Sequence, residues 1–188
     1  MHWSELAIRY LQLGFTHVLP AGADHIVFIL CLYLPAPSFK EALIRCSIFT
    51  LAHSCSLALA ASGYIPRHPA VTEPLIALSI AITAIQNIVK EESGGNQWLL
   101  IGLFGFLHGM GFAGALLDSG IAATGFIPSL LFFNLGVEAA QLTVILLAYL
   151  LVVKWCNEKP WYKKRVLYPF SILAAILAMW WVVTRIIE

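Results

Sequence analysis

Residues 17–28 of the chain read HVLPAGADHIVF, and they place two histidines and an aspartate at the start of a long apolar run. His17 and Asp24 are seven residues apart, so a continuous helix would carry both on one face. Pro20 and Gly22 lie between them and favour a bent or broken helix, which a bilayer tolerates only where the backbone is buried or lines a cavity. An aspartate in so apolar a segment needs a partner or a bound cation.

The composition is that of a membrane protein. Of the 188 residues, 60% are hydrophobic and 11% are charged, and the mean hydropathy is +0.85; a soluble domain carries about a quarter charged residues. A helix needs ~20 apolar residues to cross a bilayer. We therefore expect an all-α integral membrane protein, a bundle of about six transmembrane helices in a single domain over residues 1–188, with the first helix bent or broken near Pro20. The predicted spans are 12–34, 42–63, 72–90, 97–117, 127–153 and 166–187.

Lysine and arginine are distributed unevenly between the two ends of these spans. The connections after the first, third and fifth spans, counted with the span ends, hold Lys40, Arg45, Lys90, Lys154, Lys159, Lys163, Lys164 and Arg165. The opposite side holds Arg9, Arg67 and Arg185. Because cytoplasmic loops are enriched in basic residues, we expect the larger set in the cytoplasm and both termini outside it, in a bacterial-type inner or plasma membrane.

Charge and cysteine content argue against several other classes. The net charge of +1, without a basic aromatic patch, gives no sign of nucleic-acid binding. The 4 cysteines lack CxxC spacing and are expected to be reduced packing residues. His68, between Arg67 and Pro69, is expected in a solvated loop. The first residues, MHWSELAIRY, have no basic region followed by a small-residue cleavage site, and are not expected to act as a signal peptide.

Five of the six predicted spans carry polar side chains at depth, and these form the candidate site. The candidate metal ligands are His17, Asp24, His25, His53, His108 and Glu138. The candidate supporting or pathway residues are Glu73, Asn87, Asn134 and Gln141. In the predicted orientation His53, His108 and Glu138 each lie roughly 15 Å below the outer boundary, with Asp24 and His25 slightly shallower. We therefore expect one shared site in the outer half of the membrane.

The free energy of insertion points to a bound cation at this site. An acid at the centre of a transmembrane helix costs ~2.5–3.5 kcal/mol, so Asp24 and Glu138 together cost about 5–7 kcal/mol. No lysine or arginine is expected deep in a span, since Arg45 and Arg185 lie near span ends. Histidines, protons or a bound cation remain as neutralisers. Three imidazoles with two or three carboxylates suit a divalent transition-metal ion such as nickel, cobalt or zinc.

Several of these residues also have a purely structural interpretation. His17 or His25 could cap or hydrogen-bond a bent helix, and Glu73 fits an acid in the first turn of a helix. Asn134 and Gln141 fit hydrogen bonds between helices.

The fourth span reads GLFGFLHGMGFAGALL and combines His108 with small residues at helical spacing. Gly105, Gly109 and Ala113 predict close helix–helix packing of the small-xxx-small kind.

Five stretches together resemble the HupE/UreJ family of membrane proteins. They are HVLPAGADHIVFIL, FTLAHSCSLALAASG, EPLIALSIAITAIQNI, LFGFLHGMGFAGALL and LLFFNLGVEAAQL, in family order through the first five spans. The family is associated with hydrogenase and urease maturation and is generally regarded as nickel permeases, so the resemblance implies uptake of nickel or cobalt. It also implies that His17, Asp24, His25, His53, His108 and Glu138 are the ligands.

The chain differs from the members tied most firmly to nickel. Those members have a histidine, five residues and then Asp-His in their first span, whereas six residues separate His17 from Asp24 here. They also have two histidines and a glutamate close together in a second motif. Here LHGMGFAG holds only His108, and the glutamate is Glu138 of the fifth span. The chain resembles a second branch of the family.

Two functions follow from the same residues. The first is a permease that takes a divalent metal ion from outside, strips its water with imidazoles and carboxylates, and releases it to the cytoplasm. The alternative is a membrane-embedded zinc hydrolase, with Glu138 or Asp24 as general base. The sequence has no HExxH helix, and we favour the permease. A protein that stores or senses metal without transport shares the site, and a homo-oligomer is left open.

Overall fold

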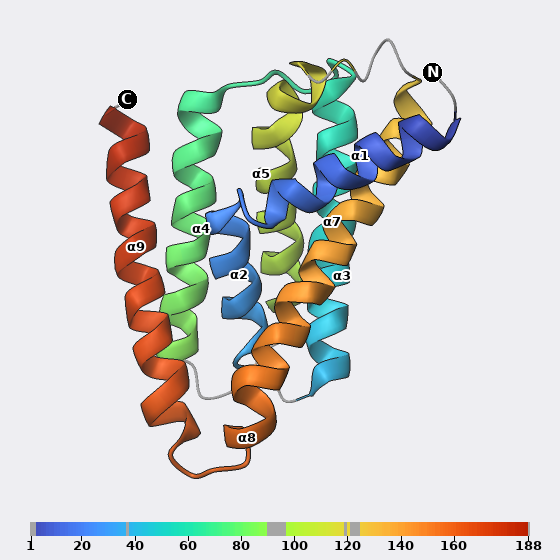
Figure 1. The fold of residues 1–188 in the computed structure, drawn as a ribbon. Helices are drawn as coiled ribbons and strands as arrows, with labels where there is room; N and C mark the ends of the chain where they lie inside the picture. The colour runs from blue at the N-terminus through green and yellow to red at the C-terminus, as the bar shows by residue number, and fades with distance from the viewer. Residues whose placement is uncertain (1–2, 37, 90–96, 119, 121–124, 188) are drawn as a thin grey trace.

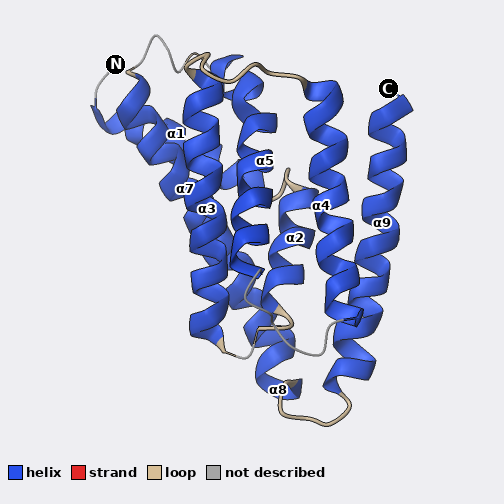
Figure 2. Ribbon diagram, turned by 180° about the vertical axis from the view of Figure 1, so that it is seen from behind, coloured by secondary structure: helices blue, strands red, loops and turns tan. Residues whose placement is uncertain are grey.

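The computed structural model describes residues 3–36, 38–89, 97–118, 120 and 125–187. Within these ranges the regular structure is helical and contains no strand (Figure 2). The α-helices are Trp3–Val18 (α1), Ala23–Tyr33 (α2), Phe39–Ala61 (α3), Pro69–Val89 (α4), Gln97–Asp118 (α5), Phe126–Ala148 (α7), Lys154–Cys156 (α8) and Tyr168–Ile187 (α9). Two π-helical turns, Tyr149–Val153 (η1) and Lys163–Leu167 (η2), extend α7 and precede α9.

The helices are long and apolar enough to cross a bilayer in the predicted number. Five spans do so by themselves, namely α3, α4, α5, the run from α7 to α8 and the run from η2 through α9. The pair α1 and α2 passes the same test only together and is bent by 71°. The prediction of an all-α membrane bundle with a broken first helix is confirmed. The first helix begins at Trp3, earlier than the predicted residue 12.

The break between α1 and α2 follows from the local sequence. Pro20 has no backbone N–H and interrupts the ladder of α1: the Leu19 N–H before it donates to the Phe15 carbonyl at 2.8 Å, and the Gly22 N–H after it donates to the Val18 carbonyl at 3.2 Å. Gly22 is buried, and a Cβ on it would collide with the His17 carbonyl. Only glycine therefore lets the chain turn back so closely on the end of α1, and α2 begins part-way through the bundle (Figure 1).

Glycines also set the two closest helix contacts. On α1 and α7, a Cβ on Gly14 would collide with the Phe133 carbonyl, and one on Gly136 with the Leu11 carbonyl. On α3 and α5, a Cβ on Gly109 would collide with the His53 carbonyl. The predicted small-residue packing is thus present on α5, and it draws that helix against α3.

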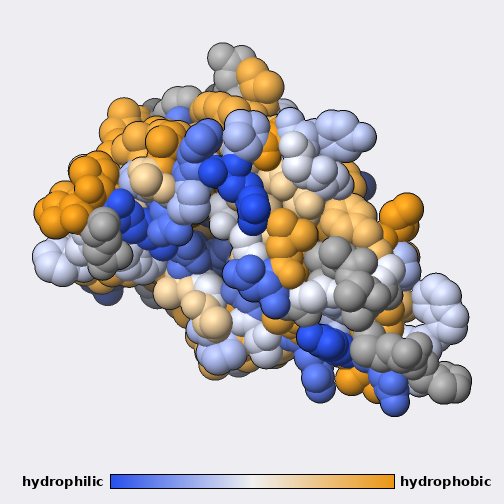
Figure 3. Space-filling view, turned by 90° about the horizontal axis from the view of Figure 1, so that it is seen from above, coloured by the Kyte–Doolittle hydropathy of each residue, from blue (hydrophilic) through white to orange (hydrophobic). Residues whose placement is uncertain are grey.

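The two ends of the bundle differ in charge. Both termini lie at one end, and the segment from α8 through η2, with five basic residues of the larger set, lies at the other (Figure 1). Seen from the end with the termini, hydrophilic side chains gather across the middle, with hydrophobic ones to either side (Figure 3). Lys90, a member of the larger basic set, lies outside the described residues. Which end faces the cytoplasm stays a prediction.

Arg45 lies near the start of α3, as expected from its place near a span end, but it is buried. Its side chain is fully buried, with Nη2 2.6 Å from Glu41 Oε1 on the same helix and Nη1 donating to the Leu32 carbonyl at 3.1 Å. Arg45 therefore links α3 to the end of α2, and it adds little to the charge that sets orientation.

Tyr162 closes the same end of the bundle. Its hydroxyl donates to the Leu34 carbonyl at 3.1 Å, just beyond the last turn of α2. Burial raises the pKa of Tyr162 to about 12, so the hydroxyl keeps its proton and this bond at neutral pH. The short helix α2 is thereby fixed at its C-terminal end.

Candidate metal centre

The broken first helix delivers three polar side chains to the interior of the bundle. His17 ends α1, and Asp24 and His25 occupy the first turn of α2. The N-terminus of a helix carries a partial positive charge that favours a carboxylate. The Asp24 carboxylate accepts from the His25 N–H at 2.8 Å. The sequence from Pro20 to Gly22 thus positions an acid and two imidazoles at a helix end inside the protein.

Two further imidazoles arrive from the tightly packed pair α3 and α5. The ring of His25 lies 5.9 Å from that of His53 and 5.2 Å from that of His108, measured between centroids. His17 lies 4.5 Å from His25 and 6.0 Å from His53 by the same measure. Imidazoles bound to one tetrahedral ion at about 2.0–2.1 Å have ring centroids about 5 Å apart. The structure therefore brings four of the six predicted ligands together at separations that suit a shared ion.

Hydrogen bonds define the tautomers of two of these rings. His25 Nδ1 lies 3.0 Å from Asp24 Oδ1, and His108 Nδ1 lies 2.8 Å from the Phe104 carbonyl. Both oxygens accept, so each Nδ1 carries a proton, and in the neutral ring each Nε2 presents a lone pair. A metal-binding histidine is held in this way, with its second nitrogen donating to a carboxylate or carbonyl.

The nitrogens that could bind an ion have no other partner. His25, His53 and His108 are at most 5% exposed. In the described part of the protein, His17 Nε2, His25 Nε2, His108 Nε2 and both ring nitrogens of His53 are buried without a hydrogen bond. Buried polar atoms are nearly always paired, so this concentration indicates a site built for a ligand.

The rings are not yet arranged as a coordination shell. Among the residues that the structure describes, no three His, Cys, Asp or Glu side chains are positioned to hold a metal ion. The ring separations suit an ion, but the nitrogens do not converge on one point. Binding by three of these groups therefore requires side-chain rotation.

Asp24 has a cationic partner that the sequence did not reveal. Arg185 Nη2, in the last turn of α9, lies 3.2 Å from Asp24 Oδ2. Arg185 lies at a span end as expected, but the expectation that only histidines, protons or a bound cation could neutralise Asp24 is wrong. The two residues are 161 positions apart, and the spacing of residues within single helices carries no information about which helices are neighbours. The available signal was a lone arginine at the end of an otherwise apolar span.

A cavity of about 230 Å³ opens onto these groups except His53, which is fully buried and does not line it. Its lining includes His17, Asp24, His25, His108 and Arg185, together with the exposed Glu73 near the start of α4. We call this space the histidine cavity. Asp24 and Glu73 give the lining two carboxylates beside one guanidinium.

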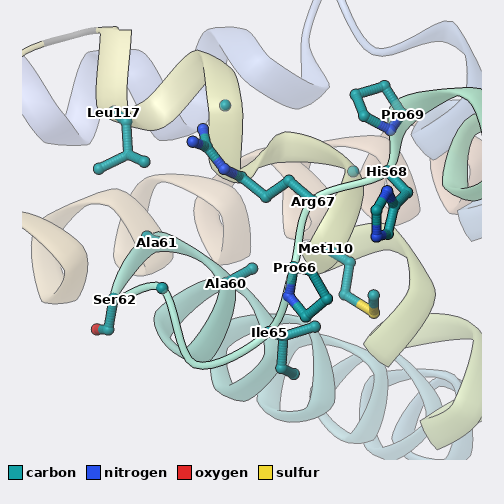
Figure 4. Close-up of a pocket in the computed structure, with 13 residues that line it drawn as sticks. Ala60, Ala61, Ser62, Ile65, Pro66, Arg67, His68, Pro69, Met110 and Leu117 are labelled. Carbon is teal, nitrogen blue, oxygen red and sulfur yellow. The ribbon is translucent and has the colours of Figure 1, made fainter.

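A second, larger cavity of about 620 Å³ lies where α3 turns into α4, against α5. Arg67 and His68 belong to its lining, and the Arg67 guanidinium extends toward Leu117 while His68 and Met110 lie on the other side (Figure 4). Among the described residues, no acid lines it. A positive charge without an acid disfavours a metal cation, so the histidine cavity is the better candidate.

Glu138 lies apart from the histidine cavity, on the contact between α7 and α3. Its Oε1 is 3.4 Å from the Ser47 hydroxyl, and among the described residues it forms no ion pair. Its inclusion in one shared ligand set rested on depth in the membrane. Depth fixes the level of a residue but not the direction in which its helix face points.

Amide groups flank Glu138 one turn away on either side of the same helix. Thr50 has one hydroxyl proton and two acceptors in reach, the Cys46 carbonyl at 3.0 Å and Gln141 Oε1 at 2.9 Å. Gln141 Nε2 is buried without a partner, as is Asn134 Oδ1. If the Gln141 amide turns over, Nε2 donates to Thr50 and the carbonyl oxygen takes the buried position. The α3–α7 contact then presents several oxygen acceptors around Glu138.

Asn87 has a structural role in this arrangement. Its Nδ2 donates to the Cys31 carbonyl at 2.8 Å and ties α4 to α2. This bond joins two helices, and it lies further along α2 than the histidine cavity, near the end of that helix.

Comparisons with known proteins identify one family. Neither the curated proteins nor the solved structures include a match to this chain. A family model described as HupE / UreJ protein matches residues 1–185, from the first helix into the last turn of α9. The chain belongs to the HupE / UreJ protein family.

Proposed function

We propose that this protein is a membrane permease for a divalent transition-metal ion, with nickel or cobalt as the transported ion. The observation that carries the proposal is the group of four neighbouring imidazoles with unpartnered buried nitrogens beside Asp24. Imidazole suits nickel, cobalt and zinc, and carboxylates add the negative charge that a dication needs. Family membership supports nickel or cobalt through the family's association with hydrogenase and urease maturation.

The ion enters through the mouth of the histidine cavity. Glu73 lines this mouth, and its carboxylate attracts a hydrated dication. His17, Asp24, His25, His53 and His108 then form the ligand set from which the ion draws its donors. Permeation requires ligands that bind and also release. Rings that must turn to bind an ion match that requirement better than a closed cage.

The inner part of the path runs along the contact between α3 and α7. Thr50 and Ser47 lie one and two turns from His53 along α3, and they face Gln141 and Glu138. We assign Glu138, with the amide oxygens of Asn134 and Gln141, to a second binding site that receives the ion after the imidazoles. Asn87 supports the path by holding α2 against α4.

The proposed topology places the histidine cavity nearer the outside. Both termini lie at the end of the bundle where the larger set of basic residues is absent (Figure 1). The positive-inside rule then assigns that end to the exterior of an inner or plasma membrane. The ion moves from the mouth beside Glu73 toward the basic connection between α8 and η2.

Metal flux into proteoliposomes tests the proposal. Purified protein in sealed vesicles containing a nickel- and cobalt-responsive dye is expected to admit either ion, with saturation. The double variant His53→Gln with His108→Gln is expected to reduce flux at least tenfold. His68→Gln is the matched control, because His68 lies outside the histidine cavity. Equal flux through the wild type and the double variant would contradict the proposal.

A further inference from the structure

Arg185 reaches from the periphery of the bundle into the histidine cavity. Its helix, α9, packs beside α4 at the edge of the bundle (Figure 1). Besides the contact with Asp24 Oδ2 at 3.2 Å, Nη1 donates to the Glu73 carbonyl at 3.1 Å. The guanidinium also lies 5.8 Å from the ring centroid of Trp181, one turn earlier on α9. These contacts direct the positive charge toward the acid at the start of α2.

The position of this charge creates a conflict with the proposed ion. Asp24 and Arg185 neutralise each other while the site holds no cation. A dication bound by the imidazoles around His25 adds two positive charges close to the guanidinium. Charges this close in a partly buried site repel strongly. The cation and Arg185 therefore compete for the same carboxylate.

We propose that Arg185 is a tethered cation that holds the place of the transported ion at Asp24 and withdraws from the carboxylate when the ion binds. This inference rests on the proposed function. Asp24 is then never left without a counter-charge, which avoids the cost of an unpaired acid in the membrane. Return of Arg185 to Asp24 weakens the hold on the ion and favours release.

An ordinary structural ion pair predicts the opposite effect on affinity. If Arg185 only orients Asp24 and α2, its removal loosens the site and weakens metal binding. If Arg185 competes with the ion, its removal strengthens binding and slows release. The sign of the change in affinity therefore distinguishes the two roles.

Cobalt titration of the full chain in detergent measures that sign, because the visible absorption of Co²⁺ reports its ligands. Arg185→Gln is expected to bind Co²⁺ at least tenfold more tightly than the wild type, and Arg185→Lys to remain within about threefold of it. Arg9→Gln, on α1 and outside the histidine cavity, controls for long-range charge. Unchanged or weaker binding by a folded Arg185→Gln would overturn the inference. Binding by neither protein would overturn the proposed function as well.

Trp181 gives a second readout in the protein with Arg185 intact. Zn²⁺, which does not quench by itself, is titrated against the wild type and Trp181→Phe, and the difference isolates the Trp181 emission. Withdrawal of the guanidinium is expected to change this emission with the same saturation curve as metal binding. Zinc binding without any change in the Trp181 emission would overturn the inference even if Arg185→Gln fails to fold.

Discussion

At the scale of single residues, Asp24 organises the histidine cavity through three contacts. It accepts from the backbone and ring of His25, and from Arg185. The ring contact fixes the His25 tautomer and leaves Nε2 unprotonated. The same carboxylate therefore prepares one ligand and balances one charge. Asp24 is tolerated in an apolar segment because His25 and Arg185 are its partners, and we propose the bound ion as a third partner.

Asp24→Asn tests the control of the tautomer. The amide can donate to His25 Nδ1, which moves the ring proton to Nε2 and blocks metal binding there. Loss of such a partner costs about 10–100-fold in metal affinity. We expect cobalt affinity to fall within this range by visible titration, opposite in sign to the effect of Arg185→Gln. Wild-type affinity in Asp24→Asn would remove Asp24 from the binding machinery.

Glu138→Gln separates binding from release. Since Glu138 lies on the α3–α7 contact and not in the histidine cavity, cobalt affinity is expected to stay within about twofold of wild type. Metal flux is expected to fall at least tenfold, because the second binding site loses its negative charge. Glu158→Gln, in the exposed connection after α8, serves as the control. Lost binding would return Glu138 to the primary ligand set, and unchanged flux would exclude it from the path.

At the scale of elements, the site depends on how closely α3 and α5 approach. A Cβ on Gly109 would collide with the His53 carbonyl and the Ser56 hydroxyl. His108 precedes Gly109 in the chain, so this contact also sets the separation of His108 from His53. The helix break at Pro20 and Gly22 likewise sets the separation of His17 from His25.

Gly109→Ala is expected to destabilise the protein and distort the site. Overpacking a tight contact costs about 1–3 kcal/mol, and we expect a lower Tm in detergent together with weaker cobalt binding. Gly102→Ala on the same helix is the control, since its nearest neighbour would be Ile48 Cγ2 at 4.0 Å. Equal Tm and equal affinity for the two variants would show that the close α3–α5 contact does not matter to the site.

Some of these elements could be predicted from the sequence, and others could not. Apolar length predicted the spans, and Pro20 with Gly22 predicted the break, because both are local properties of the chain. The meeting of His25, His53 and His108 followed from their similar depth. Glu138 was predicted in the shared site but lies outside the histidine cavity, whereas Arg185 was not predicted there but lines it. Which helices are neighbours depends on packing directions, and local periodicity does not encode these directions.

At the scale of the whole molecule, the bundle has an asymmetric charge and a site nearer one end. Exposed apolar side chains cover α9, among them Leu173, Ile176 and Trp180 at 63–66% exposure, as expected for a helix facing lipid. The short helix α2, which carries Asp24 and His25, is in contrast enclosed by its longer neighbours (Figures 1 and 2). Lipid outside and a polar interior are the arrangement that a permeation path requires.

Cysteine labelling tests the orientation. In a cysteine-free background, Lys163→Cys is expected to resist a membrane-impermeant maleimide added to intact cells, and Ser62→Cys, at the opposite end of the bundle, to react. Reaction of both after permeabilisation shows that each site is accessible. The reverse pattern in intact cells would invert the topology and with it the proposed direction of transport.

The central claim is that the imidazoles around His25 bind the transported metal. X-ray absorption of the full chain loaded with one equivalent of Ni²⁺ tests it most directly, since imidazole rings give a recognisable outer-shell signal. We predict at least three imidazole ligands in the wild type and a loss of two in His53→Gln with His108→Gln. A nickel spectrum with oxygen ligands alone, or one unchanged in the double variant, would contradict the claim.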